Sequence, residues 1–240
     1  MVIDLLRMAQ ARDHGEDADA VTERILDAAL GQFEDFGLRR STMEDIARRC
    51  GMSRITIYRR FPKKENLIQA VVLRELKSFL DCLERVGTEP DGDGGTGCGS
   101  EAGAAAGGGG LSAEDKMVER IAFALQYLGN HPLLRRLLRT EPESILPSLT
   151  VNGGVVVDMA REHIAAFIRH DLFGARTPPP EAERHVQIVA ELGVRIVLSF
   201  ILTPSSAIPM ATLEDARAFA RDLIAPVHAS VLSELAQATG

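Results

Sequence analysis

The chain has 240 residues and a formal net charge of −7 at pH 7, with 45% hydrophobic and 25% charged residues. The composition is that of a soluble globular protein, and the length suffices for two helical units with a sizeable core. The first 20 residues combine a short apolar stretch with many acids, and no uninterrupted apolar run approaches membrane-spanning length. This argues against a signal peptide and against a membrane segment, so we expect a cytoplasmic protein.

The three cysteines, Cys50, Cys82 and Cys98, are odd in number and have no C-x-x-C spacing. This pattern argues against a disulfide framework and against a zinc site. Cys50 and Cys82 fall on predicted helices, where a small apolar packing role is expected. We predict no metal ion and no cofactor.

In chain order, residues 1–20 are interpreted as a flexible tail. Apolar residues recur at helical spacing from Thr22 to Phe36 and predict a first helix that ends at Gly37. This helix is expected to brace the segment that follows.

Residues 41–67 predict a helix-turn-helix and the start of a further helix. Either Ser41 or Thr42 caps the first helix, since an acid follows each at capping-box spacing. Gly51 stands where a left-handed residue ends a helix, and Ser53 caps the next one. In that second helix Ile57 and Phe61 face the core, which leaves exposed the side chains of Arg54, Thr56, Tyr58, Arg59 and Arg60.

Charge within this stretch is opposite to that of the whole chain. Only Glu44 and Asp45 oppose the basic residues Arg39, Arg40, Arg48, Arg49, Arg54, Arg59, Arg60, Lys63 and Lys64. A solvated basic face is the simpler explanation of charge alone. Because the charges coincide with capped helices, a turn glycine and a polar helix face, DNA binding is the favoured interpretation.

The residues at fixed spacing resemble a known family. The pattern T-x-x-x-I-A, then G-x-S, T-I-Y-x-x-F and K-E-x-L is similar to the DNA-binding domain of the tetracycline-repressor (TetR) family. It is carried by Thr42, Ile46, Ala47, Gly51, Ser53, Thr56, Ile57, Tyr58, Phe61, Lys64, Glu65 and Leu67. The resemblance covers about residues 21–73 and implies a dimeric, ligand-responsive, all-helical repressor.

The resemblance also implies roles for individual residues. Thr42 with its backbone amide, Tyr58 and Lys64 would hold phosphates, while Arg54, Thr56 and Arg59 would face base edges. Ile55 departs from the family pattern, in which a small residue is common at this position. The full set predicted to bind DNA is Thr42, Ser53, Arg54, Thr56, Tyr58, Arg59, Arg60 and Lys64.

After Pro62, a helix is predicted from about Lys64 into the 80s, and the family resemblance makes it the lever between two domains. Residues 87–110 are rich in Gly and Ala and bury too little surface to order, so they predict a flexible loop. The expected domains are the tail at 1–20, the helix-turn-helix domain at 21–67, and a helical ligand-binding and dimerisation domain at 68–240 that contains this loop.

Beyond Ser112, which has capping spacing to Asp115, several more helices are predicted. Along the helix at about 153–172, a side carrying Met and His residues lines a cavity or packs in the core, and core packing is the more common case. The candidate ligand-binding residues are Phe123, Tyr127, Met159, His163, Phe167 and Arg195. Few charges fall among these candidates, which suggests a largely apolar effector, acyl or aromatic.

The helix predicted at 181–202 is apolar nearly all round beyond Val186. Glu191 and Arg195, four residues apart, either pair within this helix or reach into a ligand cavity or across a subunit boundary. Thr212 opens a last helix at 213–236. By family resemblance, these two helices would form a four-helix homodimer interface.

Catalytic motifs such as H-E-x-x-H and G-x-S-x-G are absent from the sequence, and Glu141 and Glu143 are explained as solvated acids at a helix break. No enzymatic activity is therefore expected. The sequence predicts an all-helical, homodimeric transcriptional repressor that binds a palindromic operator and responds to a small effector. The alternative is a helical ligand- or partner-binding protein without a specific operator.

Overall fold

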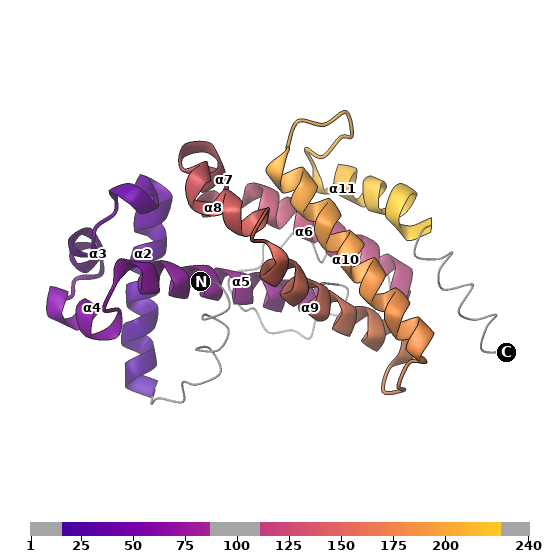
Figure 1. Cartoon of the computed structure of the whole chain (residues 1–240), viewed down its shortest axis with the longest axis horizontal. Coiled ribbons are helices and arrows are strands. Elements are labelled where there is room, and N and C mark those ends of the chain that lie inside the picture. The colour runs from indigo at the N-terminus through magenta and orange to yellow at the C-terminus, as the bar shows by residue number, and fades with distance from the viewer. Residues whose placement is uncertain (1–15, 87–110, 227–240) are drawn as a thin grey trace. The chain divides into compact units, whose positions relative to one another are not determined.

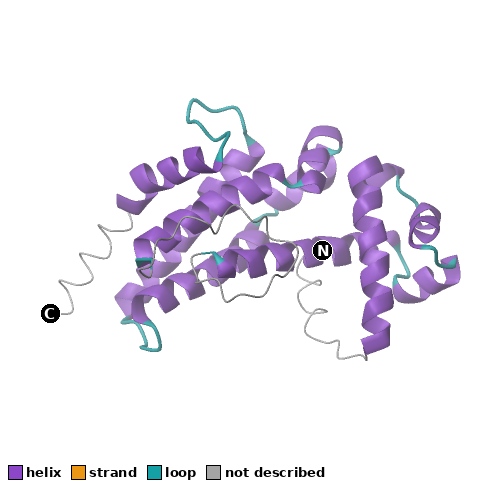
Figure 2. Ribbon diagram, turned by 180° about the vertical axis from the view of Figure 1, so that it is seen from behind, coloured by secondary structure: helices purple, strands orange, loops and turns teal. Residues whose placement is uncertain are grey.

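The computed structural model describes residues 16–86 and 111–226, and every regular element in these ranges is helical (Figure 2). Figure 1 shows the helices in chain order. They are α2 (Glu16–Arg40), α3 (Met43–Cys50), α4 (Arg54–Arg60), α5 (Lys64–Arg85), α6 (Ala113–Asn130), α7 (Pro132–Thr140), α8 (Pro142–Leu149), α9 (Gly154–Phe173), α10 (Pro180–Leu202), α11 (Leu213–Phe219) and the π-helical η1 (Ala220–Ile224). The predicted all-helical fold is confirmed, while the predicted loop at 87–110 lies outside the described residues.

The chain folds into two compact units that are each discontinuous in sequence. The first unit contains the described residues up to Ser78 together with His131–Val155. The second contains Phe79–Asn130 and the residues from Val156 onward. The functional boundaries expected from the sequence, at residues 20 and 67, stay predictions.

The core of the first unit joins five helices. Its fully buried side chains include Ile25 and Phe33 of α2, Ile46 of α3, Ile57 of α4 and Leu67 of α5. Leu133 and Leu137 of α7, four residues apart on one face, belong to the same core. Helix α7 is therefore an integral part of the unit that contains the helix-turn-helix.

Helix α2 is interrupted at Gly37, the position at which the sequence predicts its end. The backbone there has φ 82° and ψ 173°, a conformation that glycine adopts without steric cost. A β-carbon at this position would also collide with Oε1 of Glu141. Two independent features thus require glycine at position 37, namely the backbone angles and the neighbouring carboxylate.

In the second unit, α6 packs against α10, α11 and η1, and α9 packs against α10. Ala165 and Ile168 of α9 meet Val186 and Ala190 of α10. The capping box predicted at Thr212 is present, because Asp215 N donates to Thr212 Oγ1 at 3.1 Å and Thr212 N donates to Asp215 Oδ2 at 2.9 Å. Of the last helix predicted at 213–236, the part beyond residue 226 lies outside the described residues.

Helix α10 buries one face and exposes apolar side chains on another. Val186, Ala190 and Val194 are buried, whereas Ile188 and Leu192 are exposed. Among the described residues, α10 is the helix whose length and mean hydropathy of 1.7 would by themselves allow it to cross a membrane. The core helices of soluble proteins meet the same criterion, and α10 carries charged residues in its second half, including Glu191 and Arg195.

The cysteines differ from the prediction at one position. Cys50 is free and half-buried at the end of α3. Cys82 is buried on α5 as expected but is disulfide-bonded, so the sequence argument against disulfides is wrong there. Within residues 16–86 and 111–226, no group of three or more His, Cys, Asp or Glu side chains is arranged to hold a metal ion.

Candidate nucleic-acid interface

Helix α3 begins at a capping box formed by Thr42 and Asp45. Asp45 N donates to Thr42 Oγ1 at 3.1 Å, and Thr42 N donates to Asp45 Oδ2 at 3.1 Å. The hydrogen bonds from the Thr42 hydroxyl and amide hold the pKa of Asp45 below its ordinary value of 3.8. Of the two caps that the sequence allows, Thr42 is the one used, while Ser41 is buried and donates its hydroxyl to the Gly37 carbonyl at 2.6 Å.

The turn between α3 and α4 has the predicted chemistry. Gly51 ends α3 in the left-handed region at φ 67° and ψ 31°. Ser53 caps α4, because Thr56 N donates to Ser53 Oγ at 3.2 Å. The two short helices are therefore fixed at both sides of the turn by local hydrogen bonds.

Helix α4 separates an apolar side from a polar one. Ile57 and the capping residue Phe61 are buried in the core of the first unit. On the outer surface, Ile55 is 81% exposed and Tyr58 is also exposed. The remaining predicted DNA-binding residues are exposed (Thr42, Ser53, Arg54 and Arg59) or half-buried (Thr56, Arg60 and Lys64). All eight predicted DNA-binding residues thus lie between the cap of α3 and the first residue of α5.

The cations of this surface differ in their pairing. Arg48 pairs with Asp45, Arg49 pairs with Asp35 at 2.6 Å, and Arg54 pairs with Glu44. In the described part of the chain, no ion pair involves Arg59, Arg60, Lys63 or Lys64. The positive charge that is available to a polyanion therefore lies at the end of α4 and the start of α5.

Glu141, between α7 and α8, has a role that the sequence does not indicate. The residue is 6% exposed, and its carboxylate accepts hydrogen bonds from the backbone amide of Leu38 at 3.1 Å and from that of Arg39 at 3.1 and 3.3 Å. The interpretation of this residue as a solvated acid is wrong. The neighbouring Glu143 is exposed, as expected, and pairs with Arg39 at 2.8 Å.

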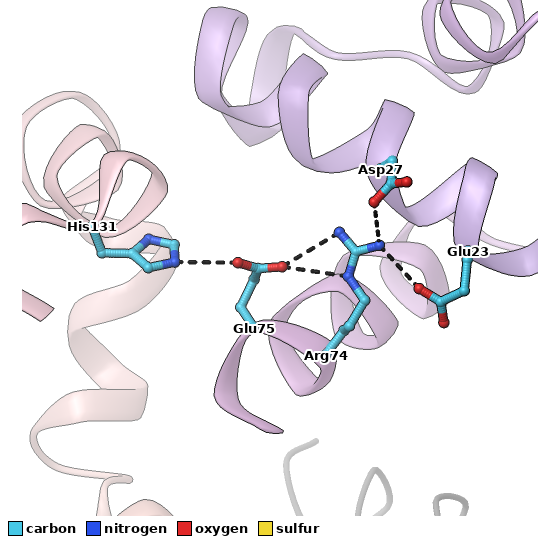
Figure 3. Close-up of polar contacts among 5 residues, drawn as sticks. All are labelled: Glu23, Asp27, Arg74, Glu75 and His131. Carbon is cyan, nitrogen blue, oxygen red and sulfur yellow. Dashed lines mark hydrogen bonds and ion pairs between the residues drawn. The ribbon is translucent and has the colours of Figure 1, made fainter. Parts of the chain in front are cut away.

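A second polar network joins α2, α5 and α7 in the same unit, as Figure 3 shows. Arg74 of α5 contacts Glu23 and Asp27 of α2 at 3.3 and 2.7 Å, and it contacts Glu75 at 3.4 Å. Glu75 Oε2 lies 3.3 Å from Nε2 of His131. Because His131 Nδ1 accepts the Leu134 amide, Nε2 is the ring nitrogen that donates to Glu75.

The candidate ligand-binding residues belong to the second unit, and the structure brings five of the six onto α6 and α9. Phe123 of α6 stacks on Phe79 at a centroid distance of 6.3 Å, and Tyr127 of α6 meets Phe79 at a tilt of 40° and 5.4 Å. On α9, the rings of His163 and Phe167 meet edge to face at 4.7 Å. Arg195 is exposed on α10 and pairs with Glu191 at 2.7 Å, which is one of the alternatives that the sequence leaves open, and Met159 is half-buried on α9.

Sequence reasoning missed the charged residues that border these rings. The guanidinium of Arg120 lies over the Phe167 ring at 4.8 Å and pairs with Asp171. Lys116 approaches the same carboxylate at 3.3 Å, so two cations face one nearly buried anion. Helical spacing in the sequence could have placed Lys116 and Arg120 on one face of α6, because they are four residues apart. It could not have identified Asp171 as their partner, because Asp171 is more than 50 residues from either of them.

His163 is the other polar group at these rings. Burial is the main cause that lowers its pKa below the ordinary value of 6.5, against the nearby charges of Glu84 and Asp81, which raise it. Neither His163 Nε2 nor Arg120 Nε has a hydrogen-bond partner among the described residues, although both atoms are buried. Two buried polar atoms beside the Phe167 ring thus have unsatisfied hydrogen-bonding capacity.

Comparison with known proteins places both halves of the chain in one family. Residues 25–71 match the family model described as bacterial regulatory proteins, tetR family. Residues 113–223 match the C-terminal domain of the bacterial tetracycline repressor. The two matches cover the helix-turn-helix and most of the second unit.

Similar proteins agree with this assignment. An uncharacterised HTH-type transcriptional regulator of Mycobacterium bovis is 39% identical over 57 residues, which are 24% of this chain and 30% of that protein. The HTH-type regulator SrpR of Pseudomonas putida is 37% identical over 80 residues, 33% of this chain and 38% of its own. The chain thus matches only about a third of the length of these relatives.

A solved structure extends the likeness in fold. The crystal structure of the TetR family repressor AlkX from Dietzia sp. strain DQ12-45-1b, implicated in biodegradation of n-alkanes, aligns with a TM-score of 0.57 at 21% identity. The alignment covers 88% of this chain and 97% of AlkX. At this identity the likeness concerns the fold.

Proposed function

Because the chain belongs to the TetR family of transcriptional regulators, we propose that it is a cytoplasmic, homodimeric repressor released from a palindromic operator by a small effector. The observation that carries this proposal is that α4 has one buried apolar side and one exposed polar side. Its buried side anchors it through Ile57, while its outer side presents Tyr58 and Arg59, which forms no ion pair with other described residues. A short, rigidly anchored helix with a polar and cationic outer face is suited to the major groove.

We assign the contacts by residue type and position. Thr42, Tyr58 and Lys64 hold phosphates and fix the register of the protein on the duplex. Arg54, Thr56 and Arg59 face base edges, and Ser53 and Arg60 flank them. Arg54 has to exchange its intramolecular partner Glu44 for DNA in order to take this role.

The proposed dimer is supported by the exposed apolar face of α10. Ile188 and Leu192, four residues apart, lie on one side of this helix and are exposed in a single chain. A second copy would cover them with its own α10 and the helix that starts at Leu213, burying one patch against itself. Such an interface would set the distance between the two copies of α4.

The effector is proposed to bind between α6 and α9, beside Phe123, Tyr127, Phe167 and His163, with Met159 and Arg195 as weaker candidates. The aromatic rings favour a largely apolar molecule. The excess positive charge of Lys116 and Arg120 over Asp171 favours one with an anionic head group, such as an acyl or aromatic carboxylate. The effector would release DNA by binding the conformation whose two recognition helices are wrongly spaced.

The test of the DNA-binding function is selection of duplexes from a random library by the purified full-length protein at moderate salt. We expect enrichment of a palindrome whose half-sites are about one helical turn apart, roughly 34–36 Å. Failure of a folded dimer to enrich any sequence, with only weak and salt-sensitive binding, would favour the alternative of a ligand- or partner-binding protein without an operator.

A further inference from the structure

Glu141 lies outside the helix-turn-helix in sequence but binds its backbone. More than 100 residues separate it from Leu38 and Arg39, whose amides donate to its carboxylate at 3.1 to 3.3 Å. It is one of the few buried polar side chains in the described residues. A buried carboxylate is costly unless hydrogen bonds compensate its charge, and these two amides supply them.

The amides in question follow the break of α2 at Gly37. Where a helix is interrupted, backbone amides need acceptors from outside the regular hydrogen-bond pattern. Glu141 provides these acceptors for two consecutive residues, in the way that a capping side chain serves the first turn of a helix. The cap here comes from a distant part of the chain.

The same connection is held from its other side by Ser41. The buried Ser41 hydroxyl donates to the carbonyls of Gly37 at 2.6 Å and Gln32 at 3.2 Å. The next residue, Thr42, caps α3. The four residues between Gly37 and Thr42 are therefore held by Glu141 through the Leu38 and Arg39 amides and by the Ser41 hydroxyl.

We propose that Glu141 is a positioning residue for DNA binding. It acts through the connection between α2 and α3, and it fixes the direction in which Thr42 and the two following helices meet the duplex. The inference rests on the proposed function. Leu133 and Leu137 anchor α7 in the core and so hold Glu141 in place, which makes the α7–α8 corner a working part of the DNA-binding unit.

Glu143 offers a matched control. It lies two residues away and also contacts Arg39, but through an exposed ion pair between side chains. Exposed pairs of this kind contribute little. Glu141→Gln and Glu143→Gln thus make the same chemical change, and only the first removes a charged acceptor from partly buried backbone amides.

The experiment compares both variants in the full-length protein on the selected operator, well below the unfolding temperature. We expect E141Q to bind all duplexes about tenfold more weakly, as the loss of a charge-assisted hydrogen bond implies. E143Q should stay within about twofold of the wild type. Hydrogen exchange of the Leu38 and Arg39 amides, measured without DNA, should accelerate in E141Q and stay unchanged in E143Q.

A double-mutant cycle distinguishes positioning from general destabilisation. If Glu141 acts through Thr42, the effects of E141Q and Thr42→Ala on affinity are less than additive, whereas those of E141Q and Arg59→Ala add. If E141Q does not fold, Glu141→Asp, which keeps the charge on a shorter side chain, replaces it with a smaller expected loss.

The outcomes separate this inference from the function on which it rests. A wild-type protein that selects no duplex refutes the proposed function. A wild-type protein that selects an operator which E141Q binds equally well refutes the positioning role. Additive effects of E141Q and Thr42→Ala also refute it.

Discussion

Arg54, the first residue of α4, forms an ion pair with Glu44 of α3 in the DNA-free chain. In a complex the Glu44 carboxylate would stand close to phosphates and would compete with them for Arg54. We predict that Glu44→Gln tightens operator binding by about two- to fivefold, because an exposed pair of this kind is weak and one negative charge is removed. The measurement is a binding titration at fixed salt. Glu114→Gln, an exposed change of equal charge at the start of α6, should have no effect.

Tyr58 and Arg59 are adjacent and both exposed, but we assign them different targets. Tyr58→Ala should weaken binding to every duplex alike, since it removes a phosphate contact. Arg59→Ala should relax the preference at one position of each half-site by about 1–3 kcal/mol. Repeating the library selection with each variant checks the assignment, and an equal loss of preference in both would contradict it.

Ile55 and Ile57 provide the same side chain in opposite environments, at 81% and 0% exposure. Ile57→Ala should lower the free energy of unfolding by about 2–5 kcal/mol, because it leaves a cavity in the core. Ile55→Ala should change it by less than about 0.5 kcal/mol. Denaturant unfolding measures both. On the operator, loss of Ile55 should alter affinity through an apolar contact in the groove, for which thymine methyl groups are suited.

Glu75 should make the free energy of unfolding depend on pH in the acidic range. Its pKa is lowered from the ordinary value of 4.5, first by the hydrogen bond from His131 and then by Arg74, against its burial. A carboxylate with a depressed folded pKa contributes its full stabilisation above 4.5 and loses it as pH falls through the folded value. At pH 7, Glu75→Gln should therefore cost about 2 kcal/mol.

The difference in unfolding free energy between the wild type and Glu75→Gln should shrink steadily in unfolding experiments below pH 4.5. Glu65→Gln, on an exposed position of the same helix, serves as the control and should cost little at any pH. A pH-independent penalty for Glu75→Gln would show that its packing, and not its charge, is what matters.

Arg120 is the proposed partner of an effector head group, and Arg195 is the weaker candidate from the sequence. We predict that a medium-chain carboxylic acid raises the unfolding temperature more than the alcohol of equal length. Arg120→Met should remove this difference, and Arg195→Met should leave it intact, because Arg195 is exposed and already paired with Glu191. Thermal unfolding with each ligand, in the absence of DNA, measures both variants.

Local features of the fold follow from the sequence because their partners are near in the chain. The caps at Thr42, Ser53 and Thr212 and the pair Glu191–Arg195 all join residues three or four apart. So does the cap at Ser112, where Asp115 N donates to the hydroxyl at 3.1 Å. The family pattern supplied the proposed DNA-binding surface in the same way, from residues within one short stretch.

The features that sequence reasoning missed all join distant residues. Glu141 has the same local surroundings as many exposed acids, and only the positive φ of Gly37 and the packing of α7 bring it to the Leu38 amide. Likewise, Asp171 becomes the partner of Arg120 only once α6 and α9 are packed. Helical periodicity identifies a buried face but does not specify which other helix covers it.

The discontinuity of the first unit has a consequence for synthesis. Leu133 and Leu137 complete a core whose other members end at Val71. At ribosomal rates of about 5–20 residues per second, these leucines emerge roughly 3–12 s after Val71. During that interval the nascent helix-turn-helix has an uncovered apolar face. Translation that stops before residue 131 would thus release a fragment that chaperones or proteases recognise before it can occupy DNA.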